Sequence, residues 1–420
     1  MIVLILVVLY SNYAAANNGI TRIEERLTTD RDFYDRWMKL VQTQASQYSE
    51  QMLDYPVGYV MSDIQKCHRA AGNSQEDANR LRPADIAIYA DMGHLSTYCN
   101  SNFSMLQHGL LDSCTHRSSS TGLPTLEKLL RVFNPNLTVV EDNERDDLLT
   151  EQARNLAEAI RKIKNYNDIW KMIAIIPSIQ DGEASETGQT AVEVLAAIEE
   201  FHKLLPERTI IVVLRSSGTG IWSDASHSQQ ACKDMLSQWK AYSQFNSNSV
   251  WTQVEDIVKV NFEKDNFTVE FLPLLKNAAL QNLPEGIDLS VLGYDCAHFS
   301  DRGLSLLHLS IWNSLMTRTP DRTSEYRPIP SAVVCPDPKC PFIRTGANSA
   351  YCIWVEDSPD EQSLAPHLIV VSILALALLL TILLLVCVCR QPSRTQDYKS
   401  TAKPFGANFS SIKFIDEDVI

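Results

Sequence analysis

Between residues 84 and 317 the chain alternates short apolar runs with longer amphipathic segments, and this alternation restricts the possible folds strongly. The apolar runs have the length of strands and few polar interruptions, as in strands buried on both faces. The longer segments repeat apolar residues every three or four positions, which is typical of helices with one buried face. The pattern predicts an α/β domain in which helices cover both faces of a parallel sheet, joined by right-handed crossovers. We expect strands at Asp85–Met92, Lys171–Ile176, Thr209–Leu214 and Phe267–Leu272, and helices at Pro124–Phe133, Leu149–Ile163, Thr190–Leu205, Gln229–Phe245 and Gly303–Thr317.

Two further apolar segments lie near the ends of the chain. Residues 1–16 combine an apolar run with small residues at Ala14–Ala16, which predicts a cleaved secretory signal peptide. Leu368–Cys389 contains no charged residue and is long enough to form a transmembrane helix. Acidic residues precede this segment and basic residues follow it, which predicts that the larger part of the chain faces outward. We therefore expect a single-pass type I protein of the plasma membrane.

Cysteine usage agrees with an extracellular location. Eight of the 10 cysteines precede the predicted transmembrane segment, and an even number suits disulfides in an oxidising compartment. Their pairing cannot be read from the sequence. No C-x-x-C pair occurs, so we expect no metal site. Sequons at Asn102, Asn136 and Asn266 are candidate glycosylation sites.

Net charge limits the possible partners of the chain, and changes in composition divide it into parts. A net charge of −14 argues against nucleic acid as a partner. The Gly-rich run after residue 215 lacks the lysine of a phosphate-binding loop, and we expect no cofactor. The predicted parts are a signal peptide (1–16), a helical extension (17–79), the α/β domain (80–320), a Cys- and Pro-rich segment (321–366), the membrane span (368–389) and a cytoplasmic tail (390–420).

Asp295 and His298 lie three residues apart in a predicted loop before the last helix. A hydroxyl nucleophile needs a base within hydrogen-bond reach and a group that orients this base. A histidine and a carboxylate at this spacing can fill both roles at one site. The alternative is a structural pair at the entrance of a helix, and the spacing alone leaves both interpretations open.

Four stretches, in the same order, resemble the sequence blocks of one enzyme family. RPADIAIYADMGHLST (82–97) resembles a block that ends in G-D-S-L-T, and TLEKLLRVFNPNLT (125–138) is similar to a second conserved stretch. DIWKMIAII (168–176) resembles the strand before a G-x-N-D block, and YDCAHFSDRGLSLLHLSIWNSLM (294–316) resembles a D-x-x-H-x-S-x-x-G block. The chain thus resembles the phospholipase B family of membrane-associated type, within the GDSL (SGNH) hydrolases. This resemblance implies a flavodoxin-like three-layer α/β/α sandwich and four catalytic blocks: a serine, a glycine amide, an asparagine amide and an Asp/His pair.

Carried over position by position, the resemblance implies a site that is retained only in part. Leu95 stands at the position of the nucleophilic serine, and His94 stands at that of the preceding aspartate. No glycine lies between residues 123 and 181 to supply the second block, and Gln180 replaces the oxyanion-binding asparagine. The Asp295/His298 pair keeps the residues of the family.

Leucine has no lone pair and cannot be acylated, so the resemblance predicts a phospholipase B-like pseudoenzyme without esterase activity. Such a protein would act at the cell surface in binding or adhesion, with a phospholipid, an acyl ester or an extracellular protein as its partner. The alternative is an active phospholipase or esterase in which a displaced serine works with Asp295 and His298. Ser96 is one position from the expected nucleophile, and Ser178, Ser216 and Ser217 are further candidates.

Overall fold

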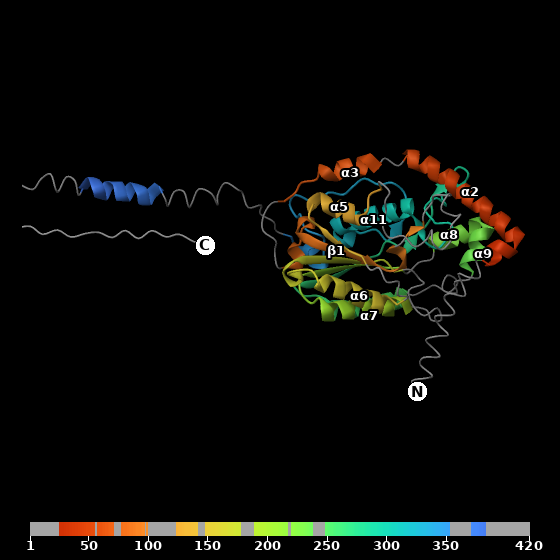
Figure 1. The fold of residues 1–420 in the computed structure, drawn as a ribbon, viewed down its shortest axis with the longest axis horizontal. Coiled ribbons are helices and arrows are strands. Elements are labelled where there is room, and N and C mark those ends of the chain that lie inside the picture. Colours follow the sequence, from red (N-terminus) through yellow and green to blue (C-terminus); the bar gives the residue numbers. More distant parts are fainter. Residues whose placement is uncertain are drawn as a thin grey trace, which may run out of the picture. The chain divides into compact units, whose positions relative to one another are not determined.

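The computed structural model describes residues 25–54, 57–70, 77–96, 98–99, 123–141, 148–177, 189–216, 220–237, 248–352 and 371–383. The chain divides into two units, Met1–Glu356 and Asp357–Ile420. The first unit contains a five-stranded sheet with helices on either side of it (Figure 1). The predicted signal peptide and cytoplasmic tail lie outside the described residues.

The central sheet is parallel throughout. Its strands are β1 (Ile86–Met92), β3 (Thr138–Val140), β4 (Trp170–Ile175), β5 (Thr209–Leu214) and β6 (Phe267–Leu272). They lie in the order β3-β1-β4-β5-β6, which in chain order is 2-1-3-4-5, the arrangement of flavodoxin-like sheets. The expected strands all form, while the sequence analysis missed β3, a strand of three residues at the edge of the sheet. The parallel sheet of an α/β fold is therefore present as predicted.

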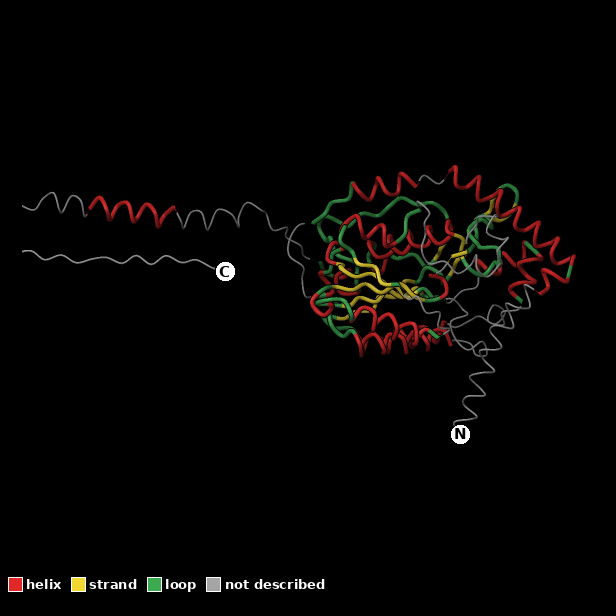
Figure 2. The backbone as a smooth tube through the Cα atoms, viewed as in Figure 1, coloured by secondary structure: helices red, strands yellow, loops and turns green. Residues whose placement is uncertain are grey.

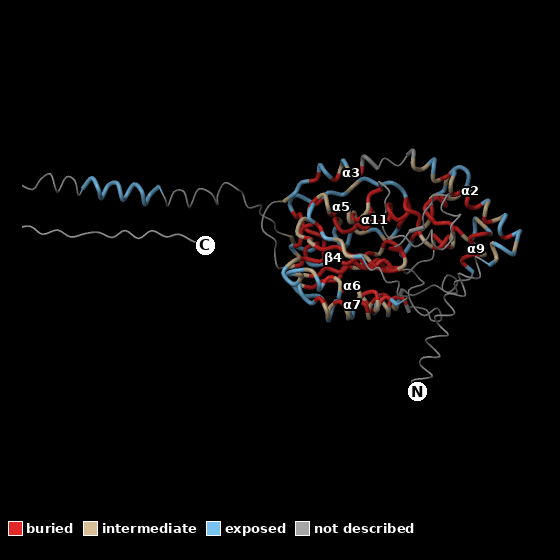
Figure 3. Tube along the Cα trace, in the orientation of Figure 1, coloured by how far each residue is buried: buried red, intermediate tan, exposed pale blue. Residues whose placement is uncertain are grey.

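Two separate apolar cores show that both faces of the sheet are buried. Alternate residues of one strand enter different cores: Ile88 belongs to one and Tyr89 to the other. One core includes residues of α6 (Leu149–Arg161), α7 (Gln189–Leu204) and α10 (Asn248–Phe262). The other includes residues of α2 (Arg31–Asp54), α5 (Leu126–Phe133), α8 (Gly220–Ser228), α9 (Gln230–Leu236) and α11 (Asp301–Met316). Figure 2 shows the strands between these two helical layers, and Figure 3 shows that burial is concentrated there.

The predicted helical extension packs on the second of these cores. It forms α2 and α3 (Val57–Gln65), and Phe33, Leu40 and Ile64 are fully buried. Short strands complete the unit: β2 (Tyr98–Cys99), β7 (Asn277–Ala278), β8 (Asn282–Leu283), β9 (Gly286–Ile287), β10 (Phe299–Ser300) and β11 (Glu325–Tyr326). The short helix α12 (Gly346–Ala350) follows in the Cys- and Pro-rich segment. The sequence analysis did not predict α8 and α10, and α9 is described only to Leu236 rather than to Phe245.

The expected fold with a C-terminal transmembrane helix needs correction. Residues 371–383 form a helix whose side chains are exposed, and the rest of the 368–389 segment lies outside the described part. No helix in the described part of the chain combines the length and apolar character that a membrane span requires. The prediction of a spanning helix is therefore wrong for the helix that the structure describes.

Three disulfides bear out the interpretation of the cysteines. Cys67 pairs with Cys335, Cys232 with Cys296, and Cys340 with Cys352. The first joins the end of the helical extension to the Cys- and Pro-rich segment over a separation of 268 residues. A crosslink across so long a loop restricts the unfolded chain strongly, and this one ties the two outer segments to each other.

A buried histidine on α11 gives a pH-dependent contribution to stability. Burial lowers the pKa of His308 to about 4, and neither ring nitrogen has a hydrogen-bond partner among the described residues. The unfolded chain, with a histidine pKa near 6.5, binds a proton that the folded chain excludes. The stabilising effect is thus complete above about pH 6.5 and is lost as the pH falls toward 4.

We expect the unfolding free energy to fall by about 1.4 kcal/mol per pH unit between roughly pH 6 and pH 4 through His308 alone. A His308→Leu variant lacks this contribution. Guanidinium chloride unfolding of both proteins, followed by tryptophan fluorescence, should show the natural chain losing stability relative to the variant over this range. An equal dependence of the unfolding free energy on pH in both proteins would contradict the assignment of this effect to His308.

Candidate active site

The turn after β1 is built around a glycine. Gly93 has φ +95°, and a Cβ placed on it would lie 2.5 Å from the carbonyl oxygen of Ile176. Its N–H donates to Oε1 of Gln152 at 3.0 Å, which fixes the turn to α6. The Leu95 N–H donates to the Ile176 carbonyl at 3.1 Å. The turn therefore lies directly against the end of β4, at the carboxyl edge of the sheet where ligands of such folds bind.

The structure places an apolar side chain at the position of the expected nucleophile. His94–Ser96 form a short 3₁₀ turn, and Leu95 is 1% exposed and part of the apolar core. Ser96 is also buried, and its hydroxyl donates to the Gly93 carbonyl at 2.7 Å. The hydroxyl proton of Ser96 is thus already bonded to the backbone of its own turn. Leu95 thus offers no oxygen at this turn, and the Ser96 hydroxyl is buried against the backbone.

Asp295 and His298 form a close pair. Nδ1 of His298 lies 2.6 Å from Oδ2 of Asp295, and both side chains are largely buried. The other carboxylate oxygen accepts the N–H groups of Ala297 and His298 at 3.0 and 3.1 Å. Cys296, between the two residues, has φ +58°, and this tight turn lets the carboxylate meet both the ring and the backbone. The two side chains therefore contact each other at one turn.

The charge of Asp295 follows from these contacts. Burial by itself raises the pKa of this carboxyl, but the attraction of His298 and the hydrogen bonds from His298 and Ala297 outweigh it and lower the pKa. The carboxylate is therefore ionised at neutral pH and acts only as an acceptor, so the facing Nδ1 carries a proton. This leaves Nε2 of His298 as the ring atom that can meet a ligand. The arrangement is that of a base and its orienting group in serine hydrolases.

Strand pairing brings the two halves of the site together. β2 and β10 pair in parallel, with Tyr98 opposite Phe299 and Cys99 opposite Ser300. β2 begins three residues after Leu95, and β10 begins immediately after His298. Since neighbouring strands lie about 4.8 Å apart, the segments that carry Leu95 and His298 enter this pair side by side. The turn that carries Leu95 and the turn that carries the Asp295/His298 pair thus lead into two paired strands.

The remaining candidate residues fall into two groups. Gln180, Ser178 and Ser217 lie outside the described residues. Ser216, at the end of β5, is fully buried, and its hydroxyl has no hydrogen-bond partner in the described part of the chain. In the same part, no cluster of three His, Cys, Asp or Glu side chains could hold a metal ion.

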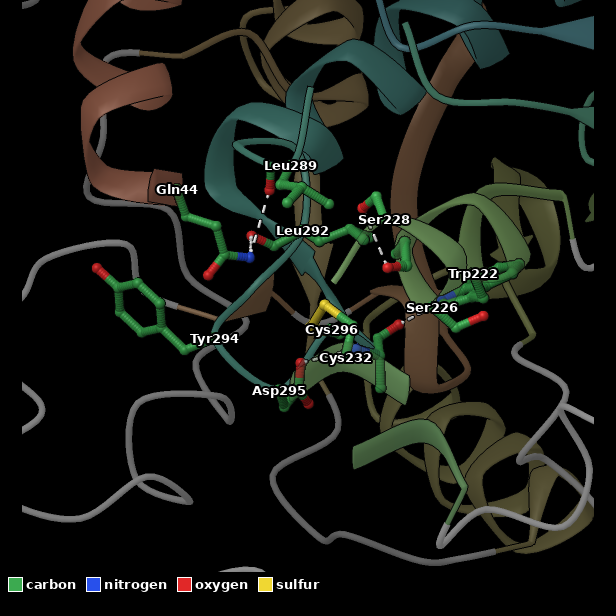
Figure 4. The surroundings of a disulfide bond; sticks show 12 residues. Gln44, Trp222, Ser226, Ser228, Cys232, Leu289, Leu292, Tyr294, Asp295 and Cys296 are labelled. Carbon is green, nitrogen blue, oxygen red and sulfur yellow. Dashed lines mark hydrogen bonds between the residues drawn. A yellow bond between two sulfur atoms is a disulfide. The ribbon is translucent and has the colours of Figure 1, made fainter. Parts of the chain in front are cut away.

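Two contributors to the site were missed by the sequence analysis. Cys296 of the D-C-A-H motif is joined to Cys232 of α9, so a disulfide anchors the turn that carries Asp295 and His298 (Figure 4). Gln44 of α2 donates to backbone carbonyls of the loop that precedes Asp295. The sequence contained a signal for the role of Gln44. This polar residue follows Trp37, Leu40 and Val41 at helical spacing and so lies on the apolar face of the helix.

The sequon residues lie in different surroundings. Asn136 is exposed in the turn between α5 and β3, whereas Asn266 is half-buried and its side-chain amide donates to Glu207. Asn102 lies outside the described residues. These positions do not test whether any of the three carries a glycan.

Comparison with known proteins gives one consistent result. The chain is 25% identical to "Phospholipase B1, membrane-associated" of Mus musculus over 335 residues, which are 67% of this chain and 22% of that protein. The proteins of the same name from Rattus norvegicus and Homo sapiens are each 24% identical, over 64% and 78% of this chain and 22% and 26% of their own lengths. No family model matches the chain, and no solved structure matches it.

The chain is similar to proteins of a phospholipase B-like family. The resemblance predicted from the four sequence blocks is thereby confirmed. This phospholipase B-like chain spans about a quarter of the length of the curated relatives that it matches. The activity of those whole proteins is therefore not carried over to it by similarity alone.

We expect Gly93→Ala to destabilise the fold more than Gly286→Ala does. Both glycines have a positive φ, so both substitutions carry backbone strain of about 1–3 kcal/mol. Only Gly93 also has a backbone carbonyl at 2.5 Å from the new Cβ, whereas nothing lies within 4 Å at Gly286. The clash should add about 2 kcal/mol, measured as the difference in unfolding free energy. Equal losses would show that the close approach to Ile176 is not limiting.

Proposed function

We propose that this chain is a phospholipase B-like protein that binds an acyl lipid without hydrolysing it. One observation supports this most directly: Leu95 is buried at the turn where the related enzymes carry a serine. A covalent mechanism of acyl transfer needs a hydroxyl or thiol beside the base. The turn offers Leu95, which has no nucleophilic atom, and Ser96, whose proton is bonded to the Gly93 carbonyl.

The retained pair favours binding at the same location. An ionised Asp295 holds the His298 ring in place, and Nε2 remains available for a polar group of a ligand. An ester or hydroxyl group there would lie beside an apolar side chain instead of a nucleophile. The lipid class follows from the names of the relatives, which are phospholipases B.

We also propose that the α/β unit faces the outside of the cell at a membrane surface, in a binding or adhesion role. Three disulfides support an oxidising compartment. The relatives carry the words "membrane-associated" in their names, which supports a location at a membrane. A protein partner at that surface is compatible with this role.

A fluorophosphonate probe tests the absence of catalysis on the purified full-length chain. We expect no covalent labelling of the natural chain, because no activated oxygen faces His298. A Leu95→Ser variant should become labelled, and Leu95→Ser with His298→Ala should lose at least about 100-fold in labelling rate, the usual contribution of a general base. Labelling of the natural chain that disappears in His298→Ala would overturn the proposal in favour of a displaced serine.

We propose that Asn136 carries an N-linked glycan, while Asn266 is modified to a smaller extent. Asn136 is exposed in a turn, whereas the Asn266 side-chain amide is engaged with Glu207 in the folded chain. Glycosidase treatment of protein from a secretory host should increase its gel mobility, and Asn136→Gln should remove most of that shift. An unchanged shift in Asn136→Gln would contradict the assignment, with Asn266→Gln as the matched control.

A further inference from the structure

The loop that leads to the Asp295/His298 pair is irregular and almost completely buried. Leu289, Val291 and Tyr294 are each at most 1% exposed, as is Asp288. A buried backbone outside helices and sheets cannot bond to water, so its carbonyl and N–H groups need partners from elsewhere in the protein. The origin of these partners determines what holds the pair in place.

Helix α2 supplies many of these partners. Nε2 of Gln44 lies 3.0 Å from the carbonyl oxygen of Gly293 and 3.3 Å from those of Leu289 and Leu292. Gln47 uses both ends of its amide, since Nε2 donates to Ile287 and Oε1 accepts the Leu289 N–H, each at 2.9 Å. Figure 4 shows Gln44 reaching from α2 to the loop.

The same face of α2 contacts the residue next to Asp295. The indole N–H of Trp37 donates to the Tyr294 carbonyl at 3.0 Å. Positions 37, 44 and 47 lie on one side of a helix, and Trp37, Gln44 and Gln47 are all buried. This row of donors therefore follows the loop from Ile287 to Tyr294.

Two other helices hold the far side of the pair. Trp222 of α8 donates its indole N–H to the Ala297 carbonyl at 2.9 Å. Cys232 of α9 is bonded to Cys296, and α9 is joined to α2 by an ion pair between Asp234 and Arg36 at 3.0 Å. Thus α2 bonds to the residue before Asp295, α9 bonds to the residue after it, and the two helices contact each other.

We propose that Trp37 and Gln44 of the helical extension are positioning residues for the Asp295/His298 pair. Burying the Gln44 amide is costly, since Oε1 is buried without a partner in the described part of the chain. A residue that only packed α2 on the core would be apolar, as Leu40 and Val41 are. The donors of Gln44 therefore fix the path of the loop, and with it the place where Asp295 meets His298.

Hydrogen–deuterium exchange of the full-length chain tests this. The amides of Ala297 and His298 bond to Asp295, so their exchange reports opening of the pair. The test variant is Gln44→Met, which keeps the side-chain length and removes the donors. The matched control is Gln42→Met, because Gln42 is exposed on the same helix.

We expect Gln44→Met to speed exchange in the 294–300 peptide about tenfold, the effect of one buried hydrogen bond, with no change in β4. Gln42→Met should change neither. Equal acceleration in both segments would mean that Gln44 stabilises the whole fold without positioning the pair, and no acceleration in either would also overturn the proposal. If Gln44→Met does not fold, Trp37→Phe is used instead, because it removes a single donor. It is judged by the same comparison of exchange in the 294–300 peptide with exchange in β4.

Proton NMR gives a second readout that a purely structural role would not affect. The Nδ1 proton between His298 and Asp295 should resonate well downfield of the amides, and Asp295→Asn should abolish this signal. Gln44→Met should shift or broaden the signal, whereas Gln42→Met should leave it unchanged. Neither measurement uses catalysis, so this inference can fail while the proposed function stands, and the reverse also holds.

Discussion

Burial of the parallel sheet on both faces is the constraint on which the rest of this structure depends. Each strand sends alternate residues into two cores, and each crossover must return over a face before the next strand begins. All carboxyl ends therefore meet at one edge. The pairing of β1 with β4 sets the Gly93 turn against Ile176, so the place of a nucleophile is determined by the sheet itself.

The second half of the site depends on a different requirement. The loop before the Asp295/His298 pair is buried without regular structure, so its backbone groups take partners from distant helices. The helical extension meets this need, while the indole of Trp222 and the Cys232–Cys296 disulfide hold the turn that follows the loop. A segment that carries no chemistry of its own thereby becomes part of the geometry of the site.

The Asp295/His298 pair is retained in this chain, whereas the turn after β1 has no nucleophile at the expected position. The Asp/His pair keeps its short hydrogen bond and its backbone donors, while the facing turn carries a buried leucine. In serine hydrolases the oxyanion hole and binding still give roughly 10³–10⁴-fold acceleration when the nucleophile is removed. The resemblance also places Gln180 at the position of an oxyanion-binding asparagine of the family. This composition supports the proposal that the chain binds a lipid without cleaving it.

Much of the fold and of the Asp295/His298 pair could be predicted from local sequence patterns. The apolar runs gave the strands from Ile86 to Leu272 almost to the residue, because a strand buried on both faces is almost continuously apolar. The D-C-A-H motif gave the pair, because Asp295 and His298 are close in sequence and share one turn. The short edge strand β3 and helix α8 were missed, because a three-residue strand and a short helix after a Gly-rich loop leave little periodicity to read. The expected membrane span was corrected, since no helix in the described part of the chain has the length and apolar character of a span.

The sequence by itself therefore determined the parallel α/β sheet, the similarity to phospholipase B and the closeness of Asp295 to His298, because these depend on local composition and order. Only the tertiary structure decided which cysteines pair, that the Ser96 hydroxyl is bonded to the backbone, and that α2 supports a loop some 250 residues away. Contacts of that kind depend on how segments distant in sequence meet in the folded chain. A side chain such as Gln44 acquires its role only when a buried carbonyl lies opposite it.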